Sequence, residues 1–272
     1  MVNTIANLEE LKARLKATWM AGDFGQVAKF IESHAEEFIA RRRIKPGMRV
    51  LDVACGTGNL AIPAAKAGAI VTGVDIATNL IEQARARALR EGVQVQFDEG
   101  DAEELAYPDA CFDLVVSMYG AMFAPRPERA AAELVRVCRS GGQIAMANWT
   151  PRGFIGQMFK VTAGHVPPPP GMPAPVLWGD EATVRERLRD GIAELQLTPV
   201  LVPFRYPFSV AETVEFHRTY FGPVQLAFAG LPEDKQPALR RDLENLYTQH
   251  NRVTDGTTYV EAEYLEVLAT HA

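Results

Sequence analysis

Short apolar runs alternate with segments of helical period over the first 150 residues. Five runs have strand character: residues 50–53, 70–75, 93–97, 112–117 and 143–148. Helical spacing of apolar residues marks the intervening segments 59–67, 78–91 and 127–138. Strands that alternate with helices pair in parallel, because the chain must cross over between them. The pattern predicts an α/β fold built on a doubly wound, Rossmann-like sheet.

The pattern changes at both ends of this core. Two helices are expected ahead of the first strand, at residues 8–20 and 26–42. After residue 150, alternating segments predict two more strands, and helical periods predict helices between them. The expected strands are 196–208 and 259–270, and the expected helices are 154–162, 181–190, 211–221 and 233–249. We therefore expect a mostly parallel, seven-stranded sheet with an antiparallel last strand.

One short segment, residues 48–59, joins a strand to a glycine turn. The apolar run 50–53 is broken by Gly56 and Gly58 just before a helix. Glycine lets the backbone bend sharply and lets a ligand approach it closely. The first N–H groups of the helix have no internal partners and can bind that ligand. This segment is the predicted centre of a binding site.

Three acidic residues fall where the carboxyl ends of the strands would meet. Asp52 interrupts the first strand, Asp75 ends the second, and Asp101 follows the third. A buried carboxylate needs a partner or the edge of a polar pocket. Asp75 can accept hydrogen bonds from a ribose diol, and Asp101 from an exocyclic amine such as that of adenine. Each of two acids also has a purely structural interpretation. Asp52 would accept hydrogen bonds from the following turn, and Asp75 would stabilise the N-terminus of the next helix through the helix dipole.

The turn at residues 56–61 also fits the pattern G-x-G-x-x-A. That pattern permits an NAD(P)- or flavin-dependent oxidoreductase. Against this reading, the carboxylate of Asp52 would repel a pyrophosphate, and Asp101 adds a second acid nearby. Three acids around one glycine turn suit a cofactor that carries cationic groups and a ribose but no phosphate.

The composition of the chain limits the kinds of partner that it can bind. The 272 residues carry a formal net charge of −6 and no basic stripe, which argues against nucleic acid. No stretch has the roughly 18 apolar residues of a membrane helix, and the N-terminus lacks the apolar core of a signal peptide. Three distant cysteines predict reduced thiols in a cytoplasmic protein. The scattered histidines show no metal-ligand spacing, so no metal is expected.

At these residues the sequence resembles the class I S-adenosylmethionine-dependent methyltransferases. The matching blocks are Val-Leu-Asp-Val-Ala-Cys-Gly-Thr-Gly at 50–58, Val-Thr-Gly-Val-Asp at 71–75, Glu-Gly-Asp-Ala-Glu at 99–103, Phe-Asp-Leu-Val-Val-Ser at 112–117 and Arg-Ser-Gly-Gly-Gln at 139–143. Their order and spacing are more specific than any one block, and they cover about residues 45–150. The nearest similarity is to the branch that includes the ubiquinone/menaquinone biosynthesis methyltransferases.

The resemblance implies S-adenosyl-L-methionine as cofactor and S-adenosyl-L-homocysteine as product. Asp52 and the Ser117 carbonyl would lie near the ammonium of the methionine moiety. Asp75 would hold the ribose hydroxyls, Ile76 would pack on the adenine, and Asp101 would accept from its amine. The implied cofactor site comprises Asp52, Ala54, Gly56, Thr57, Gly58, Asn59, Asp75, Ile76, Gly100, Asp101, Ala102 and Ser117.

The implied reaction is an in-line transfer of a methyl group from the sulfonium to an O, N, S or C atom of a small molecule. Alignment of the reactants can lower the activation free energy by on the order of 7–11 kcal/mol. A base is needed only if the acceptor must lose a proton. Tyr119 and His217 are the candidate catalytic residues, although the apolar helix face around His217 favours a core histidine. Candidate acceptor-binding residues are Trp19, Tyr119, Trp149, His165 and Tyr220. Their aromatic character indicates a hydrophobic acceptor.

We expect residues 1–272 to form a single methyltransferase domain, as a monomer or homodimer. Residues 1–45 would be a helical lid, 46–150 the cofactor-binding core, 151–250 a cap and acceptor region with the sixth strand, and 251–272 the last strand. Two other hypotheses stay open at this point: an NAD(P)-dependent oxidoreductase, and a non-catalytic protein that binds S-adenosylmethionine. Methylation of nucleic acid or protein is the less favoured form of the main hypothesis.

Overall fold

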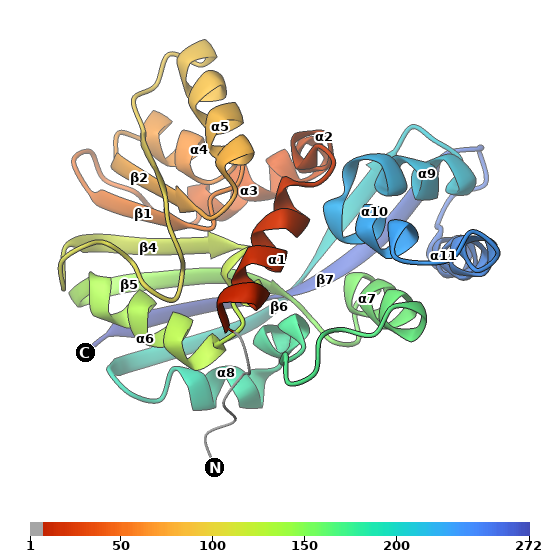
Figure 1. Cartoon of the computed structure of the whole chain (residues 1–272). Coiled ribbons are helices and arrows are strands. Elements are labelled where there is room, and N and C mark those ends of the chain that lie inside the picture. Colours follow the sequence, from red (N-terminus) through yellow and green to blue (C-terminus); the bar gives the residue numbers. More distant parts are fainter. Residues whose placement is uncertain (1–7) are drawn as a thin grey trace.

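A seven-stranded sheet runs through the computed structural model, which describes residues 8–272 (Figure 1). Residues 1–7 of the expected lid lie outside the described residues. The strand order is β3-β2-β1-β4-β5-β7-β6, with β7 antiparallel to both of its neighbours. The strands are β1 (Arg49–Val53), β2 (Ile70–Asp75), β3 (Gln96–Glu99), β4 (Phe112–Met118), β5 (Cys138–Trp149), β6 (Ile192–Tyr206) and β7 (Thr258–His271). The predicted fold class is confirmed.

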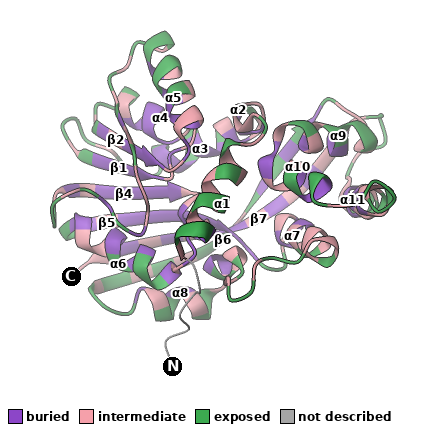
Figure 2. Ribbon diagram, viewed as in Figure 1, coloured by how far each residue is buried: buried purple, intermediate pink, exposed green. Residues whose placement is uncertain are grey.

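Helices lie along both halves of the sheet. Near β1 to β3 are α3 (Glu32–Ala40), α4 (Ala61–Lys66) and α5 (Thr78–Arg90). The helix α6 (Pro127–Val137) lies near β4 and β5, and α8 (Glu181–Arg187) lies next to α6 toward the β6 edge of the sheet. Figure 2 shows that the central strands are mostly buried, whereas the outer sides of α5 and α8 are exposed. The chain reverses its direction of strand addition between β1 and β4, and such a switch point leaves a crevice outside the carboxyl ends of the strands.

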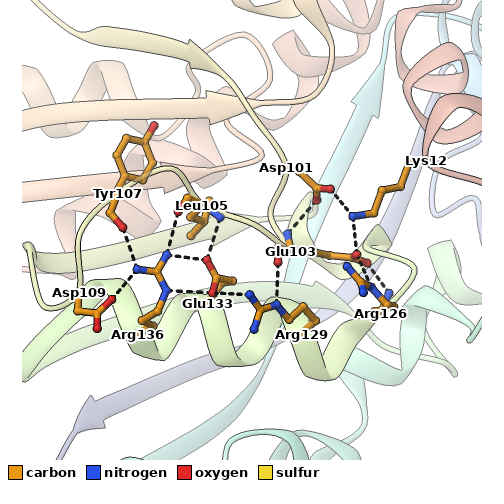
Figure 3. Close-up of polar contacts among 10 residues, drawn as sticks. All are labelled: Lys12, Asp101, Glu103, Leu105, Tyr107, Asp109, Arg126, Arg129, Glu133 and Arg136. Carbon is orange, nitrogen blue, oxygen red and sulfur yellow. Dashed lines mark hydrogen bonds and ion pairs between the residues drawn. The ribbon is translucent and has the colours of Figure 1, made fainter. Parts of the chain in front are cut away.

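The segment between β3 and β4, to which the sequence assigned no helix, interrupts the alternation of strand and helix. Residues 100–111 form turns and loop, with no helix. Side chains of α6 hold this segment instead: Arg136 donates to the carbonyl oxygens of Leu105 and Tyr107, both at 2.8 Å. The Glu133 carboxylate accepts from the backbone N–H of Leu105 at 2.9 Å (Figure 3). Tertiary contacts with α6 thus satisfy backbone groups that a helix would have paired internally.

Two predicted boundaries moved for local reasons. Residues 139–142, which follow the expected helix at 127–138, belong to β5, because Cys138 already pairs with Phe112 and the extra residues before Gln143 form a bulge in β5. The single helix expected at 26–42 is divided into α2 (Phe24–Ala28), a 3₁₀ turn (Lys29–Ile31) and α3. Ile31 has φ −118° and ψ 3°, which lies outside the helical region and breaks the helix.

The remaining helices form two groups around the carboxyl edge of the core strands. The helix α1 (Leu8–Met20) lies between the core and the cap (Figure 1). The cap comprises α7 (Phe154–His165), α9 (Val210–Tyr220), α10 (Gly222–Ala229) and α11 (Gln236–His250). The helix α10 was not expected; it begins with Gly222 and Pro223 after an extended Phe221, which separates it from α9.

Candidate functional site

A cavity lies at the carboxyl ends of β1, β2, β3 and β4. It measures about 970 Å³, a volume that includes its opening to solvent. Its floor comes from the turns after these strands, and its roof from Lys12, Leu15 and Trp19 of α1. The cofactor residues predicted from the sequence that line it are Asp52, Ala54, Gly56, Thr57, Asn59, Asp75, Ile76, Gly100, Asp101 and Ala102. The fold therefore gathers these predicted residues, which follow or end β1, β2 and β3, into one space.

Asp75 closes the glycine turn as well as facing the cavity. Its Oδ2 accepts from the backbone N–H of Gly56, and its Oδ1 from the N–H of Ala77, both at 2.8 Å. Burial raises the pKa of Asp75, and the bonds from Ala77 and Gly56 oppose that rise. The structural and ligand-binding interpretations of this acid are thus compatible: one carboxylate holds the turn and also lines the site.

Asp52 has one carboxylate oxygen without a partner. Its Oδ2 accepts from the N–H of Ala61 at 3.0 Å, whereas its buried Oδ1 makes no hydrogen bond with any described residue. Burial raises the pKa of Asp52 to about 8; the bond from Ala61 lowers it, and the nearby Asp75 raises it further. An unpaired buried acid is unfavourable by itself. A positively charged ligand group beside Oδ1 would remove this cost.

The backbone is strained where two of the floor segments meet. Ala54 after β1 has φ +57° and Tyr119 after β4 has φ +56°, the left-handed region that non-glycine residues seldom adopt. Gly120 packs so closely on Ala54 that a Cβ at Gly120 would lie 2.5 Å from the Cβ of Ala54. Strain of this kind, about 1–3 kcal/mol for each residue, is concentrated at functional sites. Close approach of the two turns thus forms the floor.

Gly58 and Ser117 belong to the predicted cofactor set but do not line the cavity. A Cβ at Gly58 would approach Ile62 at 3.2 Å and Phe97 at 3.3 Å, so glycine allows close packing there. The Ser117 Oγ accepts from the N–H of Ala121 at 3.1 Å. Both residues shape the turns beneath the site.

Tyr119 lines the cavity, but its hydroxyl is directed into the protein. Its ring stacks on Trp149 with centroids 3.7 Å apart and an interplanar angle of 11°, and its buried Oη has no hydrogen-bond partner among the described residues. Burial, with the nearby Tyr264, raises the pKa of Tyr119 well above its ordinary value. A phenol that stays protonated cannot serve as a base, so the structure favours a packing role. Trp149 lies behind Tyr119, outside the cavity lining.

Trp19, like Tyr119, is a predicted acceptor-binding residue that lines the cavity. Its ring contacts those of Phe24, Phe123 and Phe221, with centroids 5.6, 4.9 and 6.2 Å away. Phe24 and Phe123 line the cavity beside it. The roof is therefore aromatic on the side that faces the cap.

The other acceptor candidates lie in the cap, away from the cavity lining. His217 bonds the carbonyl oxygen of Thr213 through Nδ1 at 2.9 Å, and burial lowers its pKa to about 4. His165 ends α7 and is not in a loop; its Nε2 lies 2.8 Å from Oδ2 of Asp242 in α11. Tyr220 packs on Phe216, with ring centroids 5.0 Å apart. The prediction that these three residues face the acceptor is not supported, because cap packing already uses their side chains.

Sequence reasoning missed part of the lining. Lys12, Leu15 and Trp19 share one face of α1 at helical spacing, a signal that could have identified the roof. The segment 118–123 was expected to leave its strand at the pocket, and it supplies Met118, Gly120, Ala121 and Phe123. The lining residues without a predicted role are Lys12, Leu15, Phe24, Ile31, Cys55, Leu60, Val74, Leu80, Ala124 and Pro125.

Two further geometric tests concern metals and membranes. Across residues 8–272, no three His, Cys, Asp or Glu side chains are grouped so that they could hold a metal ion. Within the same range, the helices are all too short or too polar to span a bilayer.

Comparisons with known proteins agree on one family. The methyltransferase domain family matches residues 51–146. The uncharacterised protein Rv1405c of Mycobacterium tuberculosis (strain ATCC 25618 / H37Rv) is 36% identical over 96% of this chain and 95% of that protein. Phosphatidylethanolamine N-methyltransferase of Cereibacter sphaeroides is 36% identical over 48% of this chain and 64% of that protein.

A solved structure shares the fold with a ligand in place. Phosphoethanolamine N-methyltransferase 2 of Haemonchus contortus, in complex with S-adenosyl-L-methionine, superposes with a TM-score of 0.56. The sequences are 17% identical, and the match covers 87% of this chain and 52% of the other. The superposition shows that the two chains share a fold.

Proposed function

This chain belongs to the class I S-adenosylmethionine-dependent methyltransferases, and from that premise we propose that it methylates a small, largely apolar molecule. S-adenosylmethionine is its cofactor. The family membership replaces the oxidoreductase and non-catalytic hypotheses. Which atom of which acceptor receives the methyl group is the open part of the function.

We assign the cofactor to the polar floor of the cavity. The unpartnered Oδ1 of Asp52 suits the ammonium of the methionine moiety, since a cation there would compensate a buried acid. Asp75, at the tip of β2, can accept from the ribose hydroxyls. Asp101 lies across the floor, after β3, where it can accept from the adenine amine. When bound, the cofactor supplies a methyl group on a sulfonium, which a nucleophile can displace directly.

The aromatic roof is the observation that carries the acceptor class. Trp19, Phe24, Ile31, Phe123 and Pro125 line the same cavity as the three acids and give it an apolar, partly aromatic wall. Surfaces of this kind bury apolar or aromatic ligands, and a few polar groups set their orientation. This supports a hydrophobic or aromatic acceptor.

A phosphorylated acceptor fits less well. Two proteins similar to this chain are named as phosphatidylethanolamine and phosphoethanolamine N-methyltransferases. Among the described residues that line the cavity, Lys12 is the sole cation, and it is already paired with Asp101 and Glu103. A phosphate would therefore enter the site without a free cation to bind it.

The ionisable side chains of the cavity do not offer a ready base. Burial raises the pKa of Cys55 well above its ordinary value, and Tyr119 is likewise held protonated. Asp52, Asp75 and Asp101 are assigned to the cofactor. We propose that the acceptor binds in an already nucleophilic form and that the protein contributes alignment and exclusion of water.

The test is transfer of a labelled methyl group to two panels of acceptors. One panel holds phenols, aromatic amines and thiols without charge, and the other holds phosphorylated amines. The proposal expects labelled product from the first panel alone. Labelling of the phosphorylated amines alone would overturn the assignment of acceptor class but not the methyltransferase activity.

A further inference from the structure

Lys12 connects the roof helix to the floor of the site. From α1, its Nζ donates to Oδ2 of Asp101 and lies 2.7 Å from Oε2 of Glu103 (Figure 3). Burial lowers the pKa of Lys12, but its bonds to Asp101 and Glu103 outweigh that effect and raise the pKa overall. The lysine therefore stays charged, and α1 is held to the loop after β3 by a bridge to two carboxylates.

Breaking the bridge is unfavourable because Glu103 is buried. Its side chain is fully buried, and its carboxylate accepts from the Arg126 side-chain Nε at 2.8 Å and from the Arg126 backbone N–H at 2.5 Å. Lys12 supplies the remaining cationic contact. Because a buried carboxylate is stable only when it is well paired, moving α1 away from the loop removes one of its charged partners.

The other end of α1 is fixed to the cap. A Cβ at Gly222 would lie 2.0 Å from the carbonyl oxygen of Thr18, so glycine is needed for this close contact. Beyond the helix, the backbone N–H of Asp23 donates to the carbonyl oxygen of Tyr220 at 3.1 Å. Trp19 also packs on Phe221. The helix thus has a cap contact at its C-terminal end and the Lys12 bridge nearer its N-terminal end.

We propose that Lys12 is a positioning residue, an electrostatic latch that closes α1 over the adenine end of the site and slows release of the cofactor and its product. This inference rests on the proposed role of Asp101. The cap contact is the pivot, and the bridge from Lys12 to Asp101 and Glu103 is the part that opens. Lys12, Leu15 and Trp19 line the cavity from α1, so breaking the bridge would widen the path by which the ligand leaves.

Lys12 and the adenine can share Asp101. Each oxygen of Asp101 accepts one hydrogen bond in the structure: Oδ2 from Lys12 and Oδ1 from the backbone N–H of Glu103 at 2.8 Å. A carboxylate has about four lone-pair sites, so the amine can be added without displacing the lysine. The latch and the ligand therefore favour the same arrangement of Asp101.

The matched control is Lys16, one turn further along the same helix. Its Nζ pairs with Glu99, whose side chain is half exposed, and neither residue lines the cavity. An exposed pair of this kind contributes little. Comparing Lys12→Met with Lys16→Met therefore separates the latch from a general effect of removing positive charge from α1.

The experiment measures S-adenosylhomocysteine binding by calorimetry and its release rate by stopped-flow tryptophan fluorescence, to which Trp19 in the cavity lining contributes. For Lys12→Met we expect release roughly tenfold faster and affinity weaker by a similar factor, as when a closed state loses a charge-assisted contact. Lys16→Met should stay within about twofold. Tighter or unchanged binding in Lys12→Met, with its melting temperature retained, would overturn the latch.

A double-mutant cycle separates failure of the latch from failure of the site. Asp101→Asn should itself weaken S-adenosylhomocysteine, and adding Lys12→Met to it should then have a much smaller effect than in the wild type. If Asp101→Asn leaves affinity unchanged, the adenine assignment is wrong. The remaining outcome is that Asp101→Asn weakens binding while Lys12→Met lowers the affinity by the same factor in the wild type and in Asp101→Asn. In that case the site assignment stands and the latch is wrong.

Discussion

The floor and the roof of the cavity are built on different principles. The floor consists of strand ends whose acids are fixed by backbone N–H groups, as Asp52 is by Ala61 and Asp75 by Gly56. The roof consists mainly of apolar side chains of α1, and its Trp19 packs edge to face on Phe123. Backbone bonds set positions within narrow limits, whereas apolar contacts are nondirectional. The difference indicates a fixed cofactor half and an acceptor half whose shape can change with its side chains.

The largest expected effect comes from the floor. Asp75→Ala should weaken S-adenosylmethionine by at least about 100-fold, because two hydrogen bonds from the ribose to a charged acceptor would be lost. It also frees the N–H groups of Gly56 and Ala77, so the melting temperature should fall as well. Calorimetry and thermal denaturation measure the two effects separately.

Asp113→Ala is the matched control for Asp75→Ala. Asp113 also accepts a backbone N–H, from Arg49 at 2.7 Å, but it lies at the start of β4, away from the cavity lining. It should cost stability without a change in cofactor affinity. Equal loss of affinity in both variants would mean that the loss reflects unfolding and not the ribose contact.

Asp52→Asn should weaken the cofactor by about tenfold at pH 8, where the wild-type side chain is about half ionised. Below pH 8 the wild-type carboxyl must lose its proton to pair with an ammonium. Affinity should therefore fall with decreasing pH, by up to about tenfold per unit. Asp52→Asn should lack this contribution to the pH dependence of cofactor affinity. An identical pH dependence in both proteins would rule out Asp52 as the ammonium partner.

The same substitution should stabilise the ligand-free protein. The pKa of Asp52 is about 8 in the folded state, above its ordinary value. The folded state therefore binds more protons than the unfolded state between about pH 4 and 8, and stability contributed by this group declines across that range. Asp52→Asn removes the decline, so the gain in melting temperature should be larger at pH 7 than at pH 4. A gain that is equal at both pH values would contradict the burial argument.

Substitutions in the apolar wall of the cavity should affect acceptor binding more than cofactor binding. Phe123→Ala should raise the acceptor KM by roughly tenfold through lost apolar contact, while S-adenosylmethionine affinity stays within about twofold. Phe159→Ala is the control, since Phe159 contacts Phe123 with centroids 5.9 Å apart but does not line the cavity. Steady-state kinetics at saturating cofactor give the comparison. A larger effect on the cofactor than on the acceptor would show that the two halves are not separate.

The smallest effect on turnover is expected in the cap. His217→Ala should leave kcat/KM unchanged below its melting temperature and should lower stability, since Thr213, Tyr206 and Tyr247 lose a partner. The lowered pKa of His217, about 4, means that the unfolded state binds the proton first as pH falls below about 6.5. This stability contribution is therefore lost with falling pH. A large drop in kcat at full folding would restore His217 as a catalytic candidate.

Much of the floor could be predicted because its residues are ordered along a local pattern. Asp52, Gly56 and Asp75 each occupy a defined place relative to a strand end, and parallel strands bring those ends to one edge. The same logic fails between β3 and β4, where residues 100–111 are held by Arg136 of α6 and not by a helix of their own. Secondary-structure propensity gives no information on a distant side chain that binds a loop in this way.

What the sequence by itself determined is the sheet, its order of elements and the acids of the floor, since these follow from short-range periodicity and from chain direction. What only the tertiary structure decided is which side chains turn toward the site. Trp19 and Lys12 face the cavity, whereas His217 and Tyr220 pack within the cap. Contacts such as that of Gly222 with Thr18 join segments about 200 residues apart. Only packing of the whole chain fixes them, because no local pattern encodes a distant neighbour.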